Sequence, residues 1–321
     1  MKDGFLIINK PQWFTSFDVV AKVRKALGTK KVGHTGTLDP MATGVLAVCV
    51  GKATGLVNKL TCEDKIYRTT VKLGIETDTA DLTGKIIRYV KDETTYEHNG
   101  IDINNLDDTQ KNVKYLSDIA KLNYNNNKAF SADFTFALTK EQIEKTIKSF
   151  IGVQEQTPPI YSSVRVNGKK LYEYAREEKH VDIPSRKIEI YDIYDIDWDG
   201  KNELSYTVHC SKGTYIRTLN EDIAKKLGLL GTTMALERIK TGQFDIKSAI
   251  EIDNIKEENI ISVENLFEKR IVITEKDTPK LLNGIFIDVK EEDGIYNIYS
   301  NNNYLGLGKV LNGKLKRYII L

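Results

Sequence analysis

Cysteine is scarce in this chain: three cysteines stand among 321 residues, and none belongs to a C-x-x-C pair. An odd, scattered set supports neither a disulfide framework nor a zinc site, so Cys49, Cys62 and Cys210 are expected to be buried thiols. His209 and Cys210 are adjacent on an expected strand and would point to opposite faces, which argues against joint metal ligation. We therefore expect no bound metal.

Long hydrophobic runs are also missing. No apolar stretch approaches the length of a membrane span, and the apolar run at residues 5–8 is too short for the core of a signal peptide. The sequence therefore predicts a cytoplasmic protein with no membrane association. At 321 residues the chain is long enough to bury a substantial core and to form two domains.

Two common nucleotide-binding motifs are absent. The segment Gly51-Lys52-Ala53-Thr54 contains a Gly-Lys pair, but Leu46 occupies the position of the first glycine of a phosphate loop. No hydroxyl side chain directly follows the lysine, and the glycine pattern of a dinucleotide-binding turn does not occur. Neither motif therefore supports a nucleotide cofactor.

The net charge of +2 is small, but the basic residues are unevenly distributed. Residues 2–31 contain seven lysines and arginines against two aspartates, whereas residues 92–108 contain six acidic residues and no lysine or arginine. A near-neutral total can thus hide a basic face, and local basic clusters neutralise nucleic-acid phosphates. A solvated helix face gives the same local pattern, so RNA binding is supported only together with the motifs below.

The segment that organises the rest of the chain is Val-Gly-His-Thr-Gly-Thr-Leu-Asp-Pro-Met-Ala-Thr-Gly-Val-Leu at residues 32–46. It places one carboxylate, Asp39, in a polar loop before the apolar run at residues 45–50, which is typical of a buried strand. Because Pro40 disfavours the helical region for its predecessor, the backbone of Asp39 is expected to be extended and restricted. A restricted carboxylate suits catalysis, although an ordinary turn of Gly, Asp, Pro and Thr accounts for the same residues.

This segment closely resembles the signature G-H-T-G-T-L-D-P-L-A-T-G-V-L of the TruB family, the bacterial tRNA pseudouridine-55 synthases. The one departure is Met41, which stands where leucine is usual and conserves volume and polarity. Other blocks that resemble the family occur in the family's order: Lys10-Pro11 with Thr15-Ser16, residues 65–74, Thr77–Asp81, Gln156–Arg176, Cys210–Arg217 and Leu236–Phe244.

Hydrophobic spacing predicts the elements that carry these blocks. An amphipathic helix is expected over residues 16–27, with Ser16 as its N-cap and Gly28 as its stop. Residues 65–74 alternate as a strand with Tyr67 on the apolar face, where either core packing or a stacking platform would suit it. A second helix is expected over residues 139–150, with a capping box formed by Thr139 and Gln142.

The predicted fold is α+β. Residues 1–250 are expected to form a pseudouridine synthase catalytic domain on a mixed, largely antiparallel sheet, followed by a linker over 251–269. Residues 270–321 resemble the small β-rich RNA-binding domain of PUA type that ends bacterial members, with an unrelated small β-domain as the alternative. Residues 88–134 are rich in Asn, Asp and Lys and poor in large aliphatic residues, so we expect a surface insertion that is dispensable for chemistry.

The resemblance implies the roles of individual residues. Asp39 is the essential nucleophile or base, Arg217 is its partner, and Tyr67 is the platform that stacks on the target base and takes part in proton transfer. The flipped-out nucleotide is bound by a pocket that the family's motifs place at His34, Tyr67, Tyr215 and Leu236, with Lys10 as a supporting residue. A guanidinium beside a carboxylate favours its ionised form, although a structural salt bridge between Asp39 and Arg217 would also explain the pair.

The implied reaction isomerises uridine-55 in the T-arm of tRNA to pseudouridine, with no cofactor and with the enzyme acting as a monomer. The base must leave the RNA stack, because the atoms to be exchanged are not accessible in a helix. Asp39 could attack C1′, as in retaining glycosidases, or remove the ribose 2′ proton. Two other functions stay open: a tRNA-binding and folding module with incidental catalysis, and a nucleosidase, which would need a second carboxylate that no block supplies.

Overall fold

The computed structural model describes residues 2–61, 63–91, 94–97, 136 and 138–320. The described helices are α1 (Ser16–Leu27), α2 (Val57–Leu60), α5 (Lys140–Lys148), α6 (Leu171–Arg176), α7 (Ile216–Lys226) and α8 (Thr278–Leu282). The described strands up to residue 200 are β1 (Gly4–Lys10), β2 (Val32–His34), β3 (Thr43–Val50), β4 (Lys65–Leu73), β5 (Ile75–Thr77), β6 (Ile86–Lys91), β7 (Thr94–Glu97), β8 (Gly152–Gln156), β9 (Arg165–Val166), β10 (Lys169–Lys170) and β11 (Arg186–Trp198). Those that follow are β12 (Glu203–Cys210), β13 (Gly231–Thr241), β14 (Phe244–Asp245), β15 (Ile250–Glu251), β16 (Ile261–Ser262), β17 (Arg270–Ile273), β18 (Ile287–Asp288), β19 (Gly294–Ser300), β20 (Asn303–Leu311) and β21 (Lys314–Ile320).

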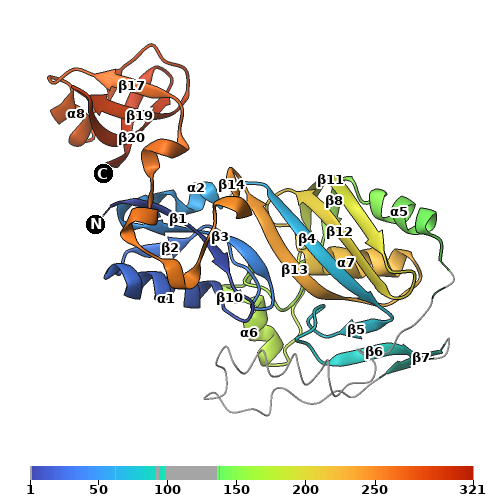
Figure 1. The fold of residues 1–321 in the computed structure, drawn as a ribbon. Coiled ribbons are helices and arrows are strands. Elements are labelled where there is room, and N and C mark those ends of the chain that lie inside the picture. Colours follow the sequence, from blue (N-terminus) through green and yellow to red (C-terminus); the bar gives the residue numbers. More distant parts are fainter. Residues whose placement is uncertain (1, 62, 92–93, 98–135, 137, 321) are drawn as a thin grey trace.

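One large mixed sheet forms the centre of the described chain (Figure 1). Eleven strands take part, and the main path runs β15-β1-β3-β13-β4-β12-β11-β8. The pairs β1–β15 and β3–β13 are parallel, whereas the other neighbours along this path are antiparallel. The predicted α+β fold on a mixed, largely antiparallel sheet is therefore confirmed.

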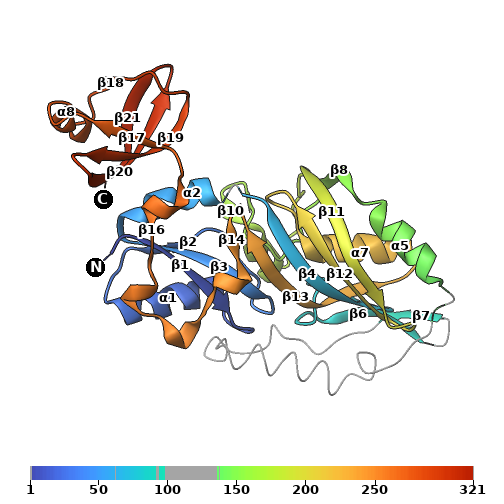
Figure 2. The ribbon, with the colours of Figure 1, turned by 45° about the horizontal axis from the view of Figure 1, so that its top comes forward.

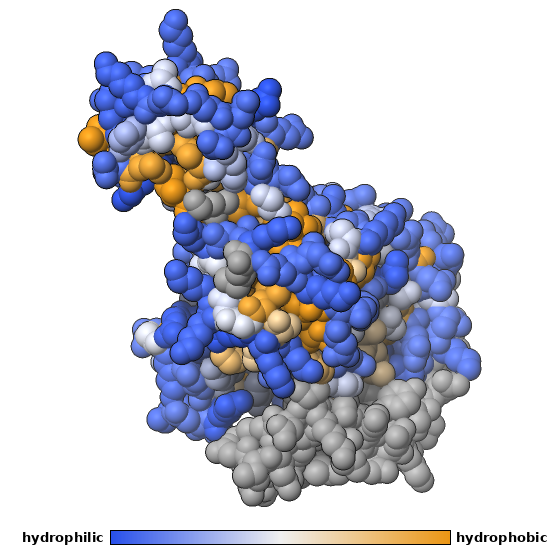
Figure 3. All heavy atoms as spheres, turned by 60° about the vertical axis from the view of Figure 1, so that its left-hand side comes forward, coloured by the Kyte–Doolittle hydropathy of each residue, from blue (hydrophilic) through white to orange (hydrophobic). Residues whose placement is uncertain are grey.

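A smaller sheet follows at the carboxyl end, in the order β17-β19-β20-β21-β18. Figures 1 and 2 show it beyond the end of the large sheet that carries β1 and α2, with α8 beside it. It has a buried core of its own, to which Ile271, Leu281, Ile298 and Leu315 contribute. Figure 3 shows this part as a lobe joined to the body through a narrow neck, with apolar residues gathered around the neck.

A second cluster of buried apolar residues fills the neck and packs the two sheets together. Leu307 of β20 and Ile319 of β21 pack with Phe5 of β1 and with Leu56 from the 3-10 turn that precedes α2. Gly55 lies in the same turn, and a Cβ added there would sit 3.1 Å from Ile319 Cδ1, so the smaller sheet approaches this turn closely.

The start of α1 differs from the prediction. Thr15, and not Ser16, is the N-cap: its hydroxyl accepts from the Asp18 N–H at 3.1 Å, while the Asp18 carboxylate accepts from the Thr15 N–H at 2.8 Å. The Ser16 hydroxyl instead accepts from the Leu38 N–H at 2.9 Å, so it ties the helix to the loop that carries Asp39. The predicted stop is confirmed, because Gly28 ends α1 in the left-handed conformation.

The other local predictions have mixed outcomes. The capping box of Thr139 and Gln142 is present at the start of α5. Cys49 and Cys210 are buried free thiols, while Cys62 lies outside the described residues. The expected insertion begins inside a β5-β6-β7 sheet that extends to residue 97, and residues 98–135 lie outside the described part of the chain. No described helix combines the length and apolarity needed to cross a bilayer.

Candidate active site

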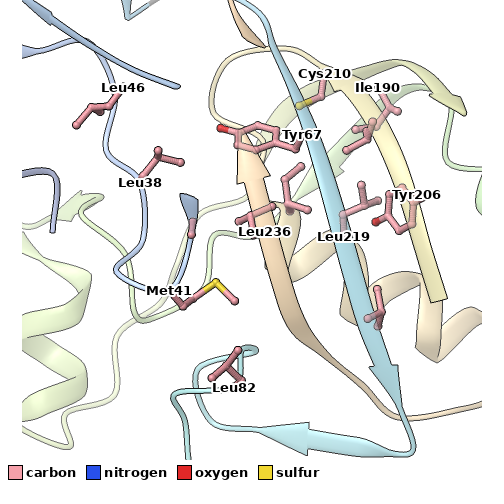
Figure 4. Packing of buried hydrophobic residues seen from close by; sticks show 14 of the residues in the cluster. Leu38, Met41, Leu46, Tyr67, Leu82, Ile190, Tyr206, Cys210, Leu219 and Leu236 are labelled. Atoms are coloured by element: carbon pink, nitrogen blue, oxygen red, sulfur yellow. The ribbon is translucent and has the colours of Figure 1, made fainter. Parts of the chain in front are cut away.

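A cavity of about 980 Å³ opens between the loop at residues 36–40 and the strands β4 and β13. Its lining includes Asp39, Tyr67, Tyr215, Arg217 and Leu236, which come from four different segments of the chain. Figure 4 shows Tyr67 and Leu236 together on β4 and β13, with Leu38 and Met41 of the preceding loop across from them. The large sheet thus supplies a rigid wall, and the loop carries the carboxylate.

Asp39 of the loop and Arg217 of α7 form an ion pair that lines the cavity. Arg217 Nε lies 2.9 Å from Asp39 Oδ2, and Arg217 Nη2 donates to Asp39 Oδ1 at 3.3 Å. Both carboxylate oxygens therefore lie within ion-pair distance of the guanidinium, and the Nη2–Oδ1 contact is the hydrogen bond between them. The Arg217 side chain is 3% exposed, whereas the Asp39 side chain is 32% exposed and faces the cavity.

Asp81 is a second carboxylate at the same guanidinium. Its Oδ2 lies 3.5 Å from Arg217 Nη1, and its Oδ1 accepts from the Thr83 N–H at 2.9 Å and the Thr79 hydroxyl at 2.9 Å. Burial raises the pKa of Asp81, while the Arg217 charge opposes this shift. One buried cation therefore serves two carboxylates, of which Asp39 alone is substantially exposed.

Arg217 is held by backbone groups as well. Its Nη1 donates to the Thr79 carbonyl at 2.7 Å and its Nη2 to the Tyr161 carbonyl at 2.9 Å. Burial alone would lower the pKa of Arg217, but the charges of Asp39 and Asp81 outweigh it and raise that pKa. The guanidinium is therefore a fixed, permanently charged group.

The aromatic and apolar wall is organised around Arg238, which is buried in β13. Arg238 Nε donates to the Val45 carbonyl at 2.8 Å and its Nη2 to the Gly36 carbonyl at 3.2 Å, so one side chain holds both flanks of the Asp39 loop. Tyr67 lies nearby, and burial raises its pKa, although the Arg238 charge opposes the shift. The Tyr67 phenol therefore keeps its proton at neutral pH.

Tyr215 precedes α7 and lines the cavity beside Arg217. Its backbone is clamped by Gln156, whose Oε1 accepts from the Tyr215 N–H at 2.8 Å and whose Nε2 donates to the Tyr215 carbonyl at 3.1 Å. The Arg186 guanidinium lies 5.3 Å from the centre of the Tyr215 ring. These contacts fix the orientation of the ring at the cavity wall.

Lys10 and His34 lie outside the described lining of the cavity. Lys10 is fully buried, and its Nζ donates to the carbonyls of Phe14 and Pro40 at 2.6 and 3.2 Å, so it supports the Asp39 loop from within. Burial lowers the pKa of Lys10 to about 7, with the Asp39 charge opposing the shift. Burial, followed by the Arg238 charge, lowers the pKa of His34, which is therefore neutral at pH 7.

The arrangement offers the Asp39 carboxylate, a fixed cation behind it and a protonated phenol in one cavity, which Asp78 and Asp81 also line. Such a carboxylate can attack an electron-poor carbon or accept a proton, while Tyr67, Tyr215 and Leu236 offer flat and apolar surface to a ring. Among the described residues, no three His, Cys, Asp or Glu side chains are grouped so that they could hold a metal ion. Asp81, Arg238 and Gln156 stand in the resembling blocks of the sequence, but their contacts depend on segments far apart in the chain.

Comparisons with known proteins show the family of this chain. A family model described as TruB family pseudouridylate synthase (N terminal domain) matches residues 24–106 and 119–216. The tRNA pseudouridine synthase B of Clostridium perfringens (strain 13) is 38% identical over 321 residues, covering 96% of this chain and 95% of that relative. The enzyme of the same name from Caldanaerobacter subterraneus subsp. tengcongensis is 36% identical over 320 residues, and the match covers 98% of this chain and 97% of that relative.

Solved structures extend the likeness to the fold. An H/ACA RNP bound to a substrate RNA containing 2′-deoxyuridine includes a chain with a TM-score of 0.59 and 20% identity, covering 96% of this chain and 78% of that one. An archaeal box H/ACA sRNP Nop10-Cbf5 complex includes a chain with a TM-score of 0.57 and 19% identity, and the match covers 98% of this chain and 82% of that one. The family match and the near full-length identity to curated relatives show that this chain belongs to the TruB family of pseudouridylate synthases and is an isomerase.

Proposed function

We propose that this enzyme converts uridine-55 in the T-arm of tRNA to pseudouridine, with Asp39 as the essential carboxylate. The observation that carries the proposal is the Asp39–Arg217 pair, in which a carboxylate that is 32% exposed lies with both oxygens close to the guanidinium, inside a cavity lined by Tyr67 and Leu236. The curated relatives named above as tRNA pseudouridine synthases support tRNA as the substrate. A tRNA substrate also supports a cytoplasmic location, and we propose that the enzyme acts as a monomer.

In this proposal the target uridine leaves the RNA stack and its base enters the cavity. The N1–C1′ bond breaks, the uracil rotates while it is held, and its C5 forms a bond to C1′. C5 then loses its proton and N1 gains one, so the product is an isomer of the substrate. Asp39 either attacks C1′ or removes the 2′ proton, and Arg217 Nε lies 2.9 Å from its Oδ2.

The roles that we propose for the remaining site residues follow from the family resemblance, and their positions support them. Tyr67 stacks on the extruded base and, as a protonated phenol, takes part in proton transfer. Tyr215 and Leu236 confine the base on the other sides. Lys10 holds the Pro40 carbonyl, and His34, whose Nδ1 accepts from the Gly36 N–H at 3.4 Å, supports the same loop.

The decisive experiment measures tritium release from tRNA that carries [5-³H]uridine, because breaking the C5–H bond releases the label. We expect release by the wild type and none by Asp39→Asn, while both bind tRNA with similar affinity. Asp78→Asn is the matched control, since Asp78 lines the same cavity but accepts a hydrogen bond from the Lys85 N–H. It should retain release.

No release from the wild type, with tight tRNA binding by both proteins, would contradict the proposal and favour a tRNA-binding and folding module. Release by Asp39→Asn at the wild-type rate would remove Asp39 from the chemistry.

A further inference from the structure

Phe17 of α1 is an exposed aromatic side chain close to the cavity. Its side chain is 64% exposed, although phenylalanine is among the residues most often buried. It follows Thr15, which lines the cavity, and Ser16, whose hydroxyl bonds to the Leu38 backbone beside Asp39. The exposed ring therefore belongs to a residue two positions along the chain from the cavity lining.

Arg24 holds this ring. The Arg24 guanidinium lies 5.7 Å from the centre of the Phe17 ring, and both residues lie on the same side of α1. Its Nη2 donates to the Val32 carbonyl of β2 at 3.2 Å, which fixes the guanidinium. A cation against one face of the ring orients the ring and leaves its exposed surface to a second flat group.

Exposed basic residues continue along the same part of the chain. Lys25 lies on the exposed side of α1, and Lys30 and Lys31 are exposed in the turn that leads to β2. Positive charges on the helix that carries an exposed ring, and on the turn after it, match a phosphate backbone with an unstacked base.

We propose that Phe17 is a stacking platform for an RNA nucleotide that flanks the one whose base enters the cavity. This inference rests on the proposed function. Extruding a base removes a stacking partner from each neighbouring base, and an aromatic ring at the rim replaces one of them. Phe17 thus contributes to binding the opened RNA and does not touch the reacting atoms.

The test is a set of equilibrium dissociation constants for tRNA, measured for the wild type and for Phe17→Ala, Phe17→Leu and Phe17→Tyr. Stacking on one base predicts that Phe17→Ala weakens binding by between about 5-fold and about 100-fold. Phe17→Leu should weaken it nearly as much, because leucine keeps apolar volume but has no ring, and Phe17→Tyr should bind like the wild type. Because Phe17 is exposed, none of the three should lower the melting temperature.

A salt series separates stacking from charge. The slope of log K against log salt concentration should be the same for Phe17→Ala and the wild type, because no phosphate contact is lost. Tyr194→Ala is the matched control, because Tyr194 is an exposed aromatic on β11. Tyr194 pairs with Thr207, and Thr207 pairs with Arg68 of β4. Arg68 points to the opposite face of the sheet from its neighbour Tyr67, so Tyr194 lies away from the cavity face. Its affinity for tRNA should not change.

Three outcomes would overturn the inference: wild-type affinity in Phe17→Ala, full affinity in Phe17→Leu, or an altered salt slope in Phe17→Ala. Weakened binding by Phe17→Ala with intact tritium release at saturating tRNA supports it. If the wild type binds no tRNA at all, the proposed function fails first and this inference fails with it, which is a different result from a selective loss in Phe17→Ala.

Discussion

At the scale of single residues, the shared guanidinium of Arg217 is the feature with the clearest consequence. Asp81 contacts the Arg217 guanidinium from the buried side, and Asp39 contacts it from the cavity side. The Asp81 contact fixes the position of Arg217, and therefore that of Asp39. Because the positive charge is shared between two carboxylates, Asp39 keeps enough electron density to react. Asp81→Asn removes the ionic contact that positions Arg217 from the buried side, so the guanidinium and the Asp39 carboxylate lose their fixed orientation. We expect kcat to fall by between about 10-fold and 100-fold, with KM for tRNA unchanged.

Single-turnover tritium release measures this effect directly. Asp78→Asn is the comparison, because it changes a carboxylate of the same loop that contacts the Lys85 backbone. Equal losses of kcat in both variants would mean that loop stability, and not the Arg217 contact, sets the rate.

A second prediction concerns Glu221 on α7. Burial, followed by the charges of Glu76 and Asp222, raises the pKa of Glu221 to about 7, from an ordinary value of 4.5. The folded protein then holds a proton that the unfolded chain releases, so stability falls as the pH rises from 4.5 through 7. Glu221→Gln removes this penalty, and we expect it to be more stable than the wild type by about 2 kcal/mol at pH 8 and similar to it at pH 4.5.

Urea unfolding at a series of pH values provides the measurement. The exposed Glu141→Gln on α5 should follow the wild-type profile. A constant difference between Glu221→Gln and the wild type across the pH range would show that Glu221 does not titrate in this window.

At the scale of elements, the parallel contact between β3 and β13 deserves a test because it follows the Asp39 loop directly. Gly44 pairs with Arg238 and has φ +99°, and an added Cβ would lie 2.3 Å from the Arg238 carbonyl oxygen. Gly44→Ala must therefore part the two strands as well as adopt a strained backbone. We expect a loss of more than about 2 kcal/mol of unfolding free energy.

Chemical denaturation of Gly44→Ala can be compared with that of Gly28→Ala. Gly28 also has a positive φ, but an added Cβ there meets nothing within 4 Å, so strain alone should reduce its stability by about 1 kcal/mol. Equal losses in the two variants would leave no role for the close approach of the strands.

Some of these elements could be predicted from the sequence, because their signals are local. The stop at Gly28 and the capping box of Thr139 are set by residues within one turn, and both are present. The N-cap of α1 was misassigned to Ser16 because two adjacent hydroxyl residues are equivalent in a local pattern. Only the distant Leu38 backbone, which engages the Ser16 hydroxyl, distinguishes them.

The same limit applies to the site. The resembling blocks pointed to Asp39, Tyr67 and Arg217, which the structure brings to one cavity. The residues that hold these side chains in place could not be predicted. Arg238 bonds to the carbonyls of Gly36 and Val45, which lie 202 and 193 residues away in the sequence. A strand pattern alone does not show that an arginine points into the core. Lys10 is similar: its local sequence shows a lysine-proline turn, but its bond to the Pro40 carbonyl is a tertiary contact.

At the scale of the whole molecule, the smaller sheet has its own core and is joined to the body through the cluster around Ile319. We propose that it is a separately folding unit whose stability is coupled to the body through this cluster. Ile319→Asp places a charge in the joint and leaves the core at Ile298 and Leu315 intact. We expect the single thermal transition of the wild type to split in two in calorimetry.

Leu311→Asp is the control, because Leu311 lies on β20 of the same sheet but is 54% exposed. It should keep a single transition near the wild-type temperature. One cooperative transition in Ile319→Asp would mean that the two sheets do not fold as separable units.

The place of β4 in the large sheet has a consequence for synthesis in the cell. β4 ends at Leu73, yet its neighbours β12 and β13 begin at Glu203 and Gly231. At about 5–20 residues per second, a ribosome takes roughly ten seconds to supply the first of these partners. During that interval the nascent chain presents a strand with one apolar face and both edges open, the kind of segment that pairs with other chains. Yield in a cell should therefore depend on nascent-chain chaperones and on elongation speed between these strands, even where the finished enzyme is stable.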